Sequence, residues 1–169
     1  MIEIKPAGIE SVETIRRLAL EIWPVAYGSI LSAEQLEYML EKFYSIPSLQ
    51  HQISDLHHQF LLVFKNEKAV GFASFSPHDE SPTIFHLNKI YVLPGQQGQS
   101  VGKQLLDFVI NEIKKCGGVA LQLNVNRNNK ALHFYEKQGF TIIREEDIDI
   151  GNGYFMNDYV MEVRLKVES

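Results

Sequence analysis

The sequence predicts an α/β (α+β) fold, a mixed sheet of about seven strands with helices on its faces. Three observations lead to this prediction. Apolar residues recur at helical spacing in some segments, follow strand spacing in others, and short clusters of Gly, Pro, Asn and Ser separate the segments. No repeat or linker-like run divides the chain, so residues 1–169 are expected to form one domain.

The N-terminal segment is expected to form a short strand and then a helix. Ile2 and Ile4 alternate with polar neighbours, as in a strand. Apolar residues then recur at helical spacing over residues 12–23, and Pro24 and Gly28 are expected to break the pattern.

A second helix and a hairpin are expected next. Residues 32–35, Ser-Ala-Glu-Gln, fit a capping box before an apolar stripe that ends near residue 44. Residues 60–65 and 69–76 are strand-like, and their connection is short enough for a hairpin. The intervening segment is expected to be solvated, because its histidines lack zinc-ligand spacing, and no metal is expected. Those histidines are His51, His57 and His58.

The rest of the chain alternates strands with helices. A strand is expected over residues 83–92, and a helix from residue 101 to the glycines at 117 and 118. Further expected elements are a strand over residues 119–125, a helix over 128–138, and strands over 140–148 and 154–165 around the turn residues 151–153.

Composition and charge exclude several classes of partner. The chain has 16 Lys and Arg against 21 Asp and Glu, a formal net charge of −5, and no basic stretch, so nucleic acid is not an expected partner. Its longest apolar runs are far shorter than the roughly 20 residues that span a bilayer, so no membrane segment is expected. The N-terminus lacks signal-peptide features and Cys116 is the only cysteine, which favours a cytoplasmic location.

Residues 87–103 pass from a strand through a glycine-containing turn into a helix. Such a turn presents unpaired backbone N–H groups at the positive end of the helix dipole, where phosphate oxygens bind. The pattern is neither a Walker loop nor a dinucleotide fingerprint, because Gly98 and Gly102 have the wrong spacing and Gln104 follows Lys103. Taken alone, the two glycines indicate only an ordinary tight connection.

A second pattern, in residues 128–140, changes that interpretation. Its sequence is Asn-Asn-Lys-Ala-Leu-His-Phe-Tyr-Glu-Lys-Gln-Gly-Phe. Together the two segments closely resemble the GNAT superfamily of acetyl-CoA-dependent N-acetyltransferases. The family's Gln/Arg-x-x-Gly-x-Gly/Ala signature falls on residues 97–102, and its Asn-x-x-Ala-x-x-Phe-Tyr-x-x-x-Gly-Phe pattern falls on residues 128–140. The resemblance is good over residues 60–140 and weaker over the whole chain.

The resemblance implies a mostly antiparallel sheet with one splayed parallel pair of strands, residues 84–92 and 119–125. In the family, the pantetheine arm of acetyl-CoA lies between these strands. By position, the backbone of Ile90, Tyr91 and Val92 contacts the arm, and the loop N–H groups hold the pyrophosphate. The loop residues are Gln97, Gly98, Gln99, Ser100, Val101, Gly102 and Lys103. Asn128 also lies near the cofactor in family members, although it has an alternative role as a helix N-cap.

Ser100 departs from the family pattern, since its position is usually glycine. If its backbone adopts a positive φ, the conformation costs of the order of 1 kcal/mol. The serine is therefore expected to weaken or reshape phosphate binding while leaving the identity of the cofactor unchanged.

The resemblance implies direct attack of an amine on the thioester, with a backbone N–H near Val92 stabilising the developing oxyanion. Tyr135 matches the family tyrosine that protonates the departing thiolate, and its alternative role is helix packing. His86 is the candidate general base, and Asn88 would point to the same side of the strand and hold a relay water. An equally weighted alternative makes His86 a hydrogen-bonded, partly buried strand residue.

The acceptor is expected to be a primary amine. Aromatic side chains in the N-terminal helix and the last hairpin offer walls for an aliphatic chain or a cation, and they include Trp23, Tyr27 and Tyr154. These regions loosely resemble bacterial members that acetylate spermidine and spermine, whereas Trp23 and Tyr27 have core packing as their alternative role. Polyamine, protein N-terminus and small-molecule amine all stay open, as does assembly into a homodimer.

The sequence therefore favours an acetyl-CoA-dependent N-acetyltransferase, a transferase of the acyltransferase class. The alternative is a non-catalytic acyl-CoA-binding regulatory module. Two features motivate it: the serine at residue 100 and the absence of an unmistakable general base.

Overall fold

The structure is a computed structural model that describes residues 1–96 and 100–166. Three of the expected phosphate-binding residues, Gln97, Gly98 and Gln99, lie outside the described residues. The chain divides into two compact units. Unit 1 comprises Met1–Ser76 and Asn88–Asn111, and unit 2 comprises Pro77–Leu87 and Glu112–Ser169. Whether the whole chain behaves as one domain stays a prediction.

The described residues form a seven-stranded sheet in the order β1-β2-β3-β4-β5-β7-β6. Strands β4 and β5 pair in parallel from Ile84–Ala120 to Leu87–Leu123, whereas β1–β2, β2–β3, β5–β7 and β6–β7 are antiparallel. This confirms the predicted mixed, mostly antiparallel sheet. Its strands are β1 (Ile2–Ala7), β2 (Gln59–Lys65), β3 (Lys68–His78), β4 (Ser81–Val92), β5 (Ala120–Asn126), β6 (Thr141–Gly151) and β7 (Tyr154–Arg164).

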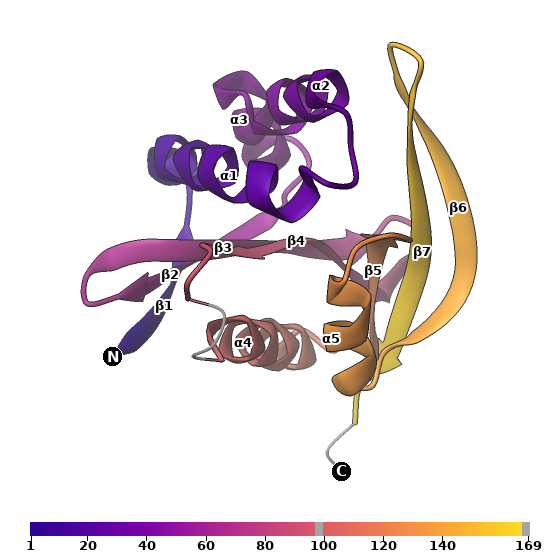
Figure 1. Ribbon diagram of the computed structural model, residues 1–169. Coiled ribbons are helices and arrows are strands. Elements are labelled where there is room, and N and C mark those ends of the chain that lie inside the picture. The colour runs from indigo at the N-terminus through magenta and orange to yellow at the C-terminus, as the bar shows by residue number, and fades with distance from the viewer. Residues whose placement is uncertain (97–99, 167–169) are drawn as a thin grey trace. The chain divides into compact units, whose positions relative to one another are not determined.

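Helices cover both faces of the strands in unit 1. Figure 1 shows α1 (Val12–Tyr27), α2 (Ala33–Tyr44) and α3 (Ile46–Ser54) on one face and α4 (Val101–Lys115) on the other. The apolar stripe of α1 is buried, and so is nearly all of β3, because helices cover that strand on both sides. The buried residues of α1 are Val12, Ile15, Leu18, Ala19, Ile22 and Trp23.

Unit 2 is built around β5 and the long hairpin of β6 and β7. Strand β5 pairs with the first half of β4 on one side and with β7 on the other. The hairpin turns at Asn152 and Gly153, whose φ angles of 54° and 80° are those of the predicted tight turn. Helix α5 (Ala131–Lys137) lies beside β5 (Figure 1).

The prediction that Pro24 breaks the first helix is wrong. Helix α1 continues through Pro24 to Tyr27 and ends at Gly28, whose N–H donates to Pro24 O at 3.0 Å. Proline removes the donor that would bond the carbonyl of Leu20. Leu20 and Pro24 are both exposed, so that carbonyl faces water and the helix tolerates the loss.

The segment that was expected to be solvated contains a helix, α3, that the sequence did not predict. The helix has recognisable start signals, since Ser45 Oγ accepts a hydrogen bond from Ser48 N at 3.2 Å and Pro47 lies in the first turn. His51 is on the exposed side of α3, where its Nδ1 lies 2.7 Å from Asp55 Oδ2. His57 and His58 follow the helix.

Candidate active site

The backbone of β4 that is expected to contact pantetheine lies close to β3. A Cβ at Gly71 would lie 2.6 Å from Tyr91 O and 3.2 Å from Val92 Cα, so only glycine permits this approach. Just beyond β4, Leu93 N donates to Val70 O at 2.8 Å. Strand β3 therefore fixes the position of residues 90–92.

The start of α4 is the described part of the turn that is expected to bind phosphate. Ser100 adopts a φ of 58°, so the condition for backbone strain at this position is met. Val101 is fully buried and anchors the helix, whereas a Cβ on Gly102 would have no atom within 4 Å. Lys103 Nζ lies 2.8 Å from Asp107 Oδ2 on the exposed surface. The open space at Gly102 and the positive end of the helix dipole are compatible with a phosphate at this helix start, and pyrophosphate binding there stays a prediction.

The two aromatic residues expected to contact the acceptor from α1 pack against Tyr91 of β4. The Trp23 ring centroid lies 4.7 Å from that of Tyr27 and 5.7 Å from that of Tyr91. The hydroxyls of Tyr27 and Tyr91 are hydrogen-bonded at 2.9 Å. Trp23 is only 5% exposed, so its contacts are those of a core residue. An acceptor contact by Trp23 or Tyr27 stays a prediction.

Asn88 belongs to a polar cluster on neighbouring strands of unit 1. Its Nδ2 donates to Ser76 Oγ at 3.0 Å and to Ser74 Oγ at 3.4 Å, and both serines are buried on β3. These bonds orient the amide, and among residues 1–96 and 100–166 no donor is bonded to Asn88 Oδ1. That orientation suits the predicted relay water.

Lys89 is a residue of this region that the sequence analysis did not identify. Its Nζ donates to Gln52 Oε1 at 2.6 Å and lies 5.5 Å from the ring centroid of Tyr44 and 5.6 Å from that of Phe60. Burial lowers the pKa of Lys89 from 10.5 to about 8. The sequence placed Lys89 in a strand of a sheet predicted to carry helices on its faces, which could have indicated a buried lysine. The sequence alone does not distinguish such a lysine from one at an exposed position of the same strand.

Unit 2 contains both proposed catalytic residues. Tyr135 is 8% exposed on α5, and its ring packs against Phe134 and Phe140 at centroid distances of 5.4 and 5.7 Å. His86 is half-buried on β4, where it pairs in register with Gln122 of β5. Both alternatives for His86 are compatible with this position.

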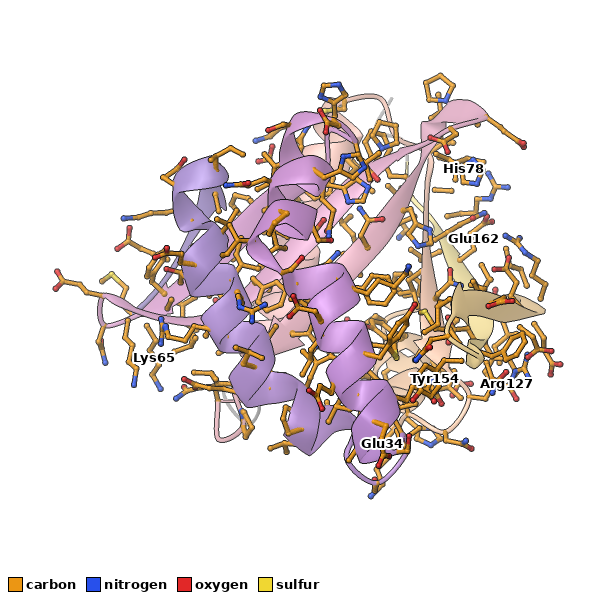
Figure 2. The ribbon with its side chains drawn as sticks, turned by 90° about the horizontal axis from the view of Figure 1, so that it is seen from above. Glu34, Lys65, His78, Arg127, Tyr154 and Glu162 are labelled. Atoms are coloured by element: carbon orange, nitrogen blue, oxygen red, sulfur yellow. The ribbon has the colours of Figure 1, made fainter. Side chains whose placement is uncertain are left out.

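The remaining two predicted residues of unit 2 are Asn128 and Tyr154. The N-cap role suggested for Asn128 is wrong, because α5 begins at Ala131 and Asn129 Oδ1 accepts the hydrogen bond from Ala131 N at 2.9 Å. Asn128 is exposed before that helix, and its cofactor role stays a prediction. Tyr154 is half-buried at the start of β7 (Figure 2).

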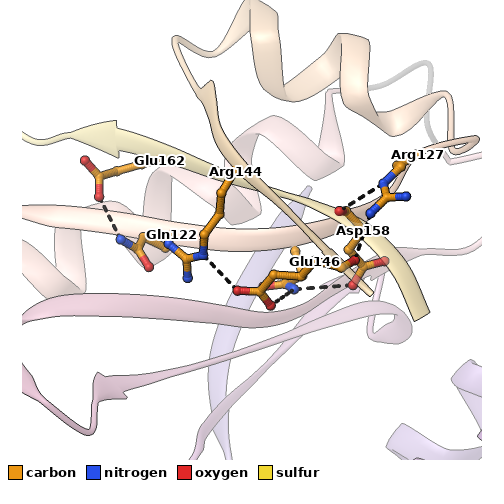
Figure 3. Close-up of polar contacts among 7 residues, drawn as sticks. Gln122, Arg127, Arg144, Glu146, Asp158 and Glu162 are labelled. Carbon is orange, nitrogen blue, oxygen red and sulfur yellow. Dashed lines mark hydrogen bonds and ion pairs between the residues drawn. The ribbon is translucent and has the colours of Figure 1, made fainter. Parts of the chain in front are cut away.

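A polar network that the sequence analysis also missed spans β5, β6 and β7 (Figure 3). Asn124 Nδ2 lies 3.3 Å from Asp158 Oδ2 and 3.5 Å from Glu146 Oε2. Asp158 is only 3% exposed. The pKa of Asp158 is raised above its ordinary value, chiefly because the carboxyl is buried, and the nearby Glu146 raises it further. The hydrogen bond from Asn124 and the charge of Arg127 oppose this rise only in part. The network therefore holds one buried carboxyl, that of Asp158.

Among the described residues, no cluster of His, Cys, Asp or Glu has the arrangement of a metal site. In the same part of the chain, no helix is long and apolar enough to cross a membrane.

A mixed sheet with one parallel strand pair, and a helix, α4, that connects the two strands of that pair, define an α/β protein in which a phosphate is expected at the start of that helix. The acetyltransferase (GNAT) domain profile matches residues 29–163, and the chain belongs to this family. It is 31% identical to the spermidine N(1)-acetyltransferase of Thermoplasma acidophilum over 166 residues, 95% of this chain and 96% of that protein.

Two further comparisons agree with this assignment. The crystal structure of the PaiA N-acetyltransferase from Thermoplasma acidophilum in complex with coenzyme A superposes with a TM-score of 0.82 at 29% identity, covering 98% of this chain and 99% of that one. The ribosomal protein bS18-alanine N-acetyltransferase of Haemophilus influenzae is 34% identical over 95 residues, 56% of this chain and 60% of that protein. The chain is therefore an acetyl-CoA-dependent N-acetyltransferase, and the comparisons support an enzyme rather than the non-catalytic module.

Proposed function

We propose that this enzyme acetylates the primary amine of a small molecule by direct attack of the amine on the acetyl-CoA thioester. The observation that carries the proposal is the similarity along nearly the whole chain to a relative named for spermidine acetylation. Similarity to the ribosomal-protein acetyltransferase covers only 56% of this chain, so a protein N-terminus is a weaker candidate acceptor.

The binding of acetyl-CoA is assigned to the backbone. Ile90, Tyr91 and Val92 offer main-chain groups to the pantetheine arm, and the N–H groups of Val101, Gly102 and Lys103 face the pyrophosphate. The bound thioester supplies the acetyl group. A backbone N–H near Val92 stabilises the negative charge that develops on the thioester oxygen, an interaction that typically contributes about 3 kcal/mol.

Two proton transfers complete the reaction. An alkylamine with a pKa near 10 is neutral in only about one molecule per thousand at pH 7, so a base is needed. His86 takes the amine proton, directly or through a water held by Asn88. As the new C–N bond forms and the C–S bond breaks, Tyr135 gives a proton to the leaving sulfur. The match of Tyr135 and its neighbours to the family pattern supports this role.

A panel of acceptors tests the proposal. Purified protein is incubated with acetyl-CoA and each amine, free thiol is measured, and the acetylated product is identified by mass spectrometry. The panel contains spermidine, simple amino acids, alkylamines and a peptide with an N-terminal alanine. We expect thiol release that is stoichiometric with acetylation of at least one small amine. Binding of acetyl-CoA without turnover on any amine would overturn the proposal.

Substitution of the two catalytic residues tests their roles. Tyr135→Phe should lower kcat about 100-fold with little change in the affinity for acetyl-CoA, whereas the control Tyr159→Phe removes a hydroxyl of the same unit and should leave kcat unchanged. His86→Ala should flatten the acid limb of the rate profile, and His78→Ala should not. Wild-type kcat in Tyr135→Phe, or an unaltered acid limb in His86→Ala, would remove that residue from the reaction.

The cellular setting is also part of the proposal. A cytoplasmic location is supported by the single cysteine, Cys116, since the chain has no pair of thiols to oxidise. Assembly as a homodimer stays a prediction that light scattering of the purified protein would decide.

A further inference from the structure

Lys89 carries a buried ammonium that no step of the proposed reaction uses. We propose that Lys89 binds an acidic group of the acceptor, so that the amine acetylated by this enzyme belongs to a molecule that also carries a carboxylate. The inference rests on the proposed function and names the substrate class of the same enzyme.

The ammonium is held in a fixed place and lacks a counter-charge. Gln52 Nε2 donates to Phe43 O at 2.9 Å and to Ser48 Oγ at 3.1 Å, which orients Gln52 Oε1 toward Lys89 Nζ. The rings of Tyr44 and Phe60 flank the same ammonium. Within the described part of the chain, no carboxylate lies within ion-pair distance of it. An ammonium has three donors and Gln52 accepts from one, so further hydrogen bonds are available.

A buried hydroxyl beside Lys89 also has a proton without an acceptor. The Tyr44 hydroxyl and Trp23 Nε1 make no well-formed hydrogen bond among the described residues, and the looser contact between them, in which the indole donates, lowers the pKa of Tyr44 and leaves the hydroxyl proton unpaired. Tyr44 is 1% exposed, and its ring lies 5.3 Å from that of Trp23 as well as beside Lys89. Buried polar groups are normally satisfied, so an excess of donors around a cation indicates that an anionic acceptor of hydrogen bonds belongs here.

Lys89 lies next in sequence to residues that are assigned to the reaction. It directly precedes Ile90, the first of the strand residues assigned to the pantetheine arm, and it directly follows Asn88, the proposed relay residue. An acceptor that presents its amine to the thioester at this strand brings its other substituents close to Lys89. A carboxylate there gains a charge-assisted hydrogen bond, whereas a second ammonium meets a like charge.

The ionisation of Lys89 gives the inference a pH signature. The titratable group in contact with the ammonium is Tyr44 of α2. One bond further away, Arg16 of α1 donates to Tyr44 O at 3.0 Å, and the backbone N–H of His58 donates to the backbone carbonyl of Gln52 at 2.9 Å. Burial raises the pKa of Tyr44 well above its usual value, with a further rise from Tyr27 and a partial lowering by Trp23, so Tyr44 stays neutral through this range. The pKa of Lys89, lowered to about 8, places the loss of the ammonium charge above neutral pH.

Matched acceptor pairs test the inference. Glycine, β-alanine, 4-aminobutyrate and 6-aminohexanoate are each compared with the alkylamine of the same chain length and no carboxylate. At neutral pH we expect at least one carboxylate-bearing acceptor to exceed its partner about 10- to 100-fold in kcat/KM, the range of a hydrogen bond between charged groups. Lys89→Met should reduce that ratio to near one, chiefly by raising KM, and Lys89→Arg should retain part of it.

Controls separate this inference from the proposed function. Lys68→Met removes an exposed lysine of β3 and should leave the ratio unchanged. If the wild-type enzyme acetylates alkylamines or spermidine as well as the acidic amines, or if Lys89→Met keeps the wild-type ratio, the inference is overturned and amine acetylation stands. If no amine of any kind is acetylated, the proposed function fails as well.

A binding measurement needs no variant and no turnover. Calorimetry on the wild-type protein with coenzyme A compares an N-acetyl-ω-amino acid with the N-alkylacetamide of equal length. Between about pH 7 and pH 9.5 the acidic product should lose about 30-fold in affinity, because the charged fraction of a group with a pKa near 8 falls by that factor, and the neutral product should not change. Equal pH dependence of the two products would overturn the inference.

Discussion

Lys89 is the residue at which folding stability and the proposed chemistry conflict. An ammonium that is removed from water without a counter-charge destabilises the folded state, and the two aromatic rings and one amide oxygen around it compensate only in part. Residues of this kind are found where a ligand supplies the missing partner. The pH dependence of folding measures the conflict directly.

The folded-state pKa of Lys89, about 8, lies below the ordinary value of 10.5, so the folded protein binds this proton more weakly than the unfolded chain does. The destabilisation is fully present below about pH 8 and is relieved as the pH rises toward 10.5. Between about pH 7.5 and pH 9.5, the free energy of unfolding of the wild type should rise by about 2 kcal/mol relative to that of Lys89→Met. Urea unfolding of both proteins measures this difference. The contributions of all other titrating groups are common to the two proteins and cancel in the comparison. A difference that is constant with pH would show that the ammonium is solvated.

Ser100 is the second residue at which the backbone itself is strained. Its φ of 58° is easy for glycine and unfavourable for a residue with a β-carbon. Ser100→Gly should raise the free energy of unfolding by about 0.5–1 kcal/mol, because the relieved strain exceeds the added entropy of the unfolded chain. It should also bind coenzyme A more tightly, since a bare backbone approaches phosphate more closely. Ser100→Ala keeps the β-carbon, so it should gain neither stability in thermal unfolding nor affinity for coenzyme A in calorimetry. Equal stability of Ser100→Gly and Ser100→Ala would contradict the inference that the backbone is strained at this position.

At the scale of elements, local periodicity predicted most strands and helices. The strand expected over residues 69–76 is β3, Lys68–His78, and the stripe that begins at Val101 is α4. Helix α3 was missed because it is short and is marked by its N-cap, Ser45, and by Pro47 in its first turn more than by an apolar stripe. The error at Pro24 has a different origin, since a proline is tolerated in a helix when the freed carbonyl faces water, and exposure is a tertiary property.

The buried charges lay beyond any local pattern. Asp158 is buried because β7 lies between β5 and β6, which α5 separates in the chain. Lys89 is half-buried as a residue, and its ammonium is buried because α2, α3 and β2 meet around it. Neither arrangement can be read from residues adjacent in sequence, whereas the contiguous motifs that indicated the cofactor could be.

The β2–β3 hairpin offers a test at the scale of one element. Its two turn residues, Asn66 and Glu67, have φ angles of 50° and 67°, a conformation in which glycine is preferred at the second position. Glu67→Gly should therefore raise the free energy of unfolding by about 0.5–1 kcal/mol without changing kcat. Glu80→Gly, at a turn residue without a positive φ, serves as the control and should be neutral or destabilising. Chemical denaturation measures both, and a loss of stability in Glu67→Gly would contradict the turn geometry.

At the scale of the whole molecule, two motifs sufficed to predict the family and the cosubstrate, while the acceptor stayed open. The difference is physical. Pyrophosphate and pantetheine are bound largely by main-chain groups, whose arrangement depends on short glycine-containing sequences such as residues 97–102. An acceptor is selected by side chains gathered from several elements, as the surroundings of Lys89 show.

The division of the chain into two units leads to a prediction about cooperativity. The boundaries fall inside β3, between Ser76 and Pro77, inside β4, between Leu87 and Asn88, and inside α4, between Asn111 and Glu112. Neither unit can unfold without breaking two strands and a helix that continue into the other, and helices and strands form cooperatively along their length. We therefore expect one unfolding transition in which both units lose structure together.

Two spectroscopic or exchange probes, together with the ligand coenzyme A, test whether the two units unfold in one transition. Fluorescence of Trp23, the single tryptophan, reports on unit 1, and hydrogen exchange of the β5, β6 and β7 amides reports on unit 2. The two should give the same urea midpoint. Coenzyme A at about 100 times its Kd should raise the free energy of unfolding by about 2.7 kcal/mol for both probes, since a ligand bound only to the folded state stabilises everything that unfolds with its site. Separate midpoints, or protection by the ligand confined to one probe, would show that the units unfold independently despite the two strands and the helix that they share.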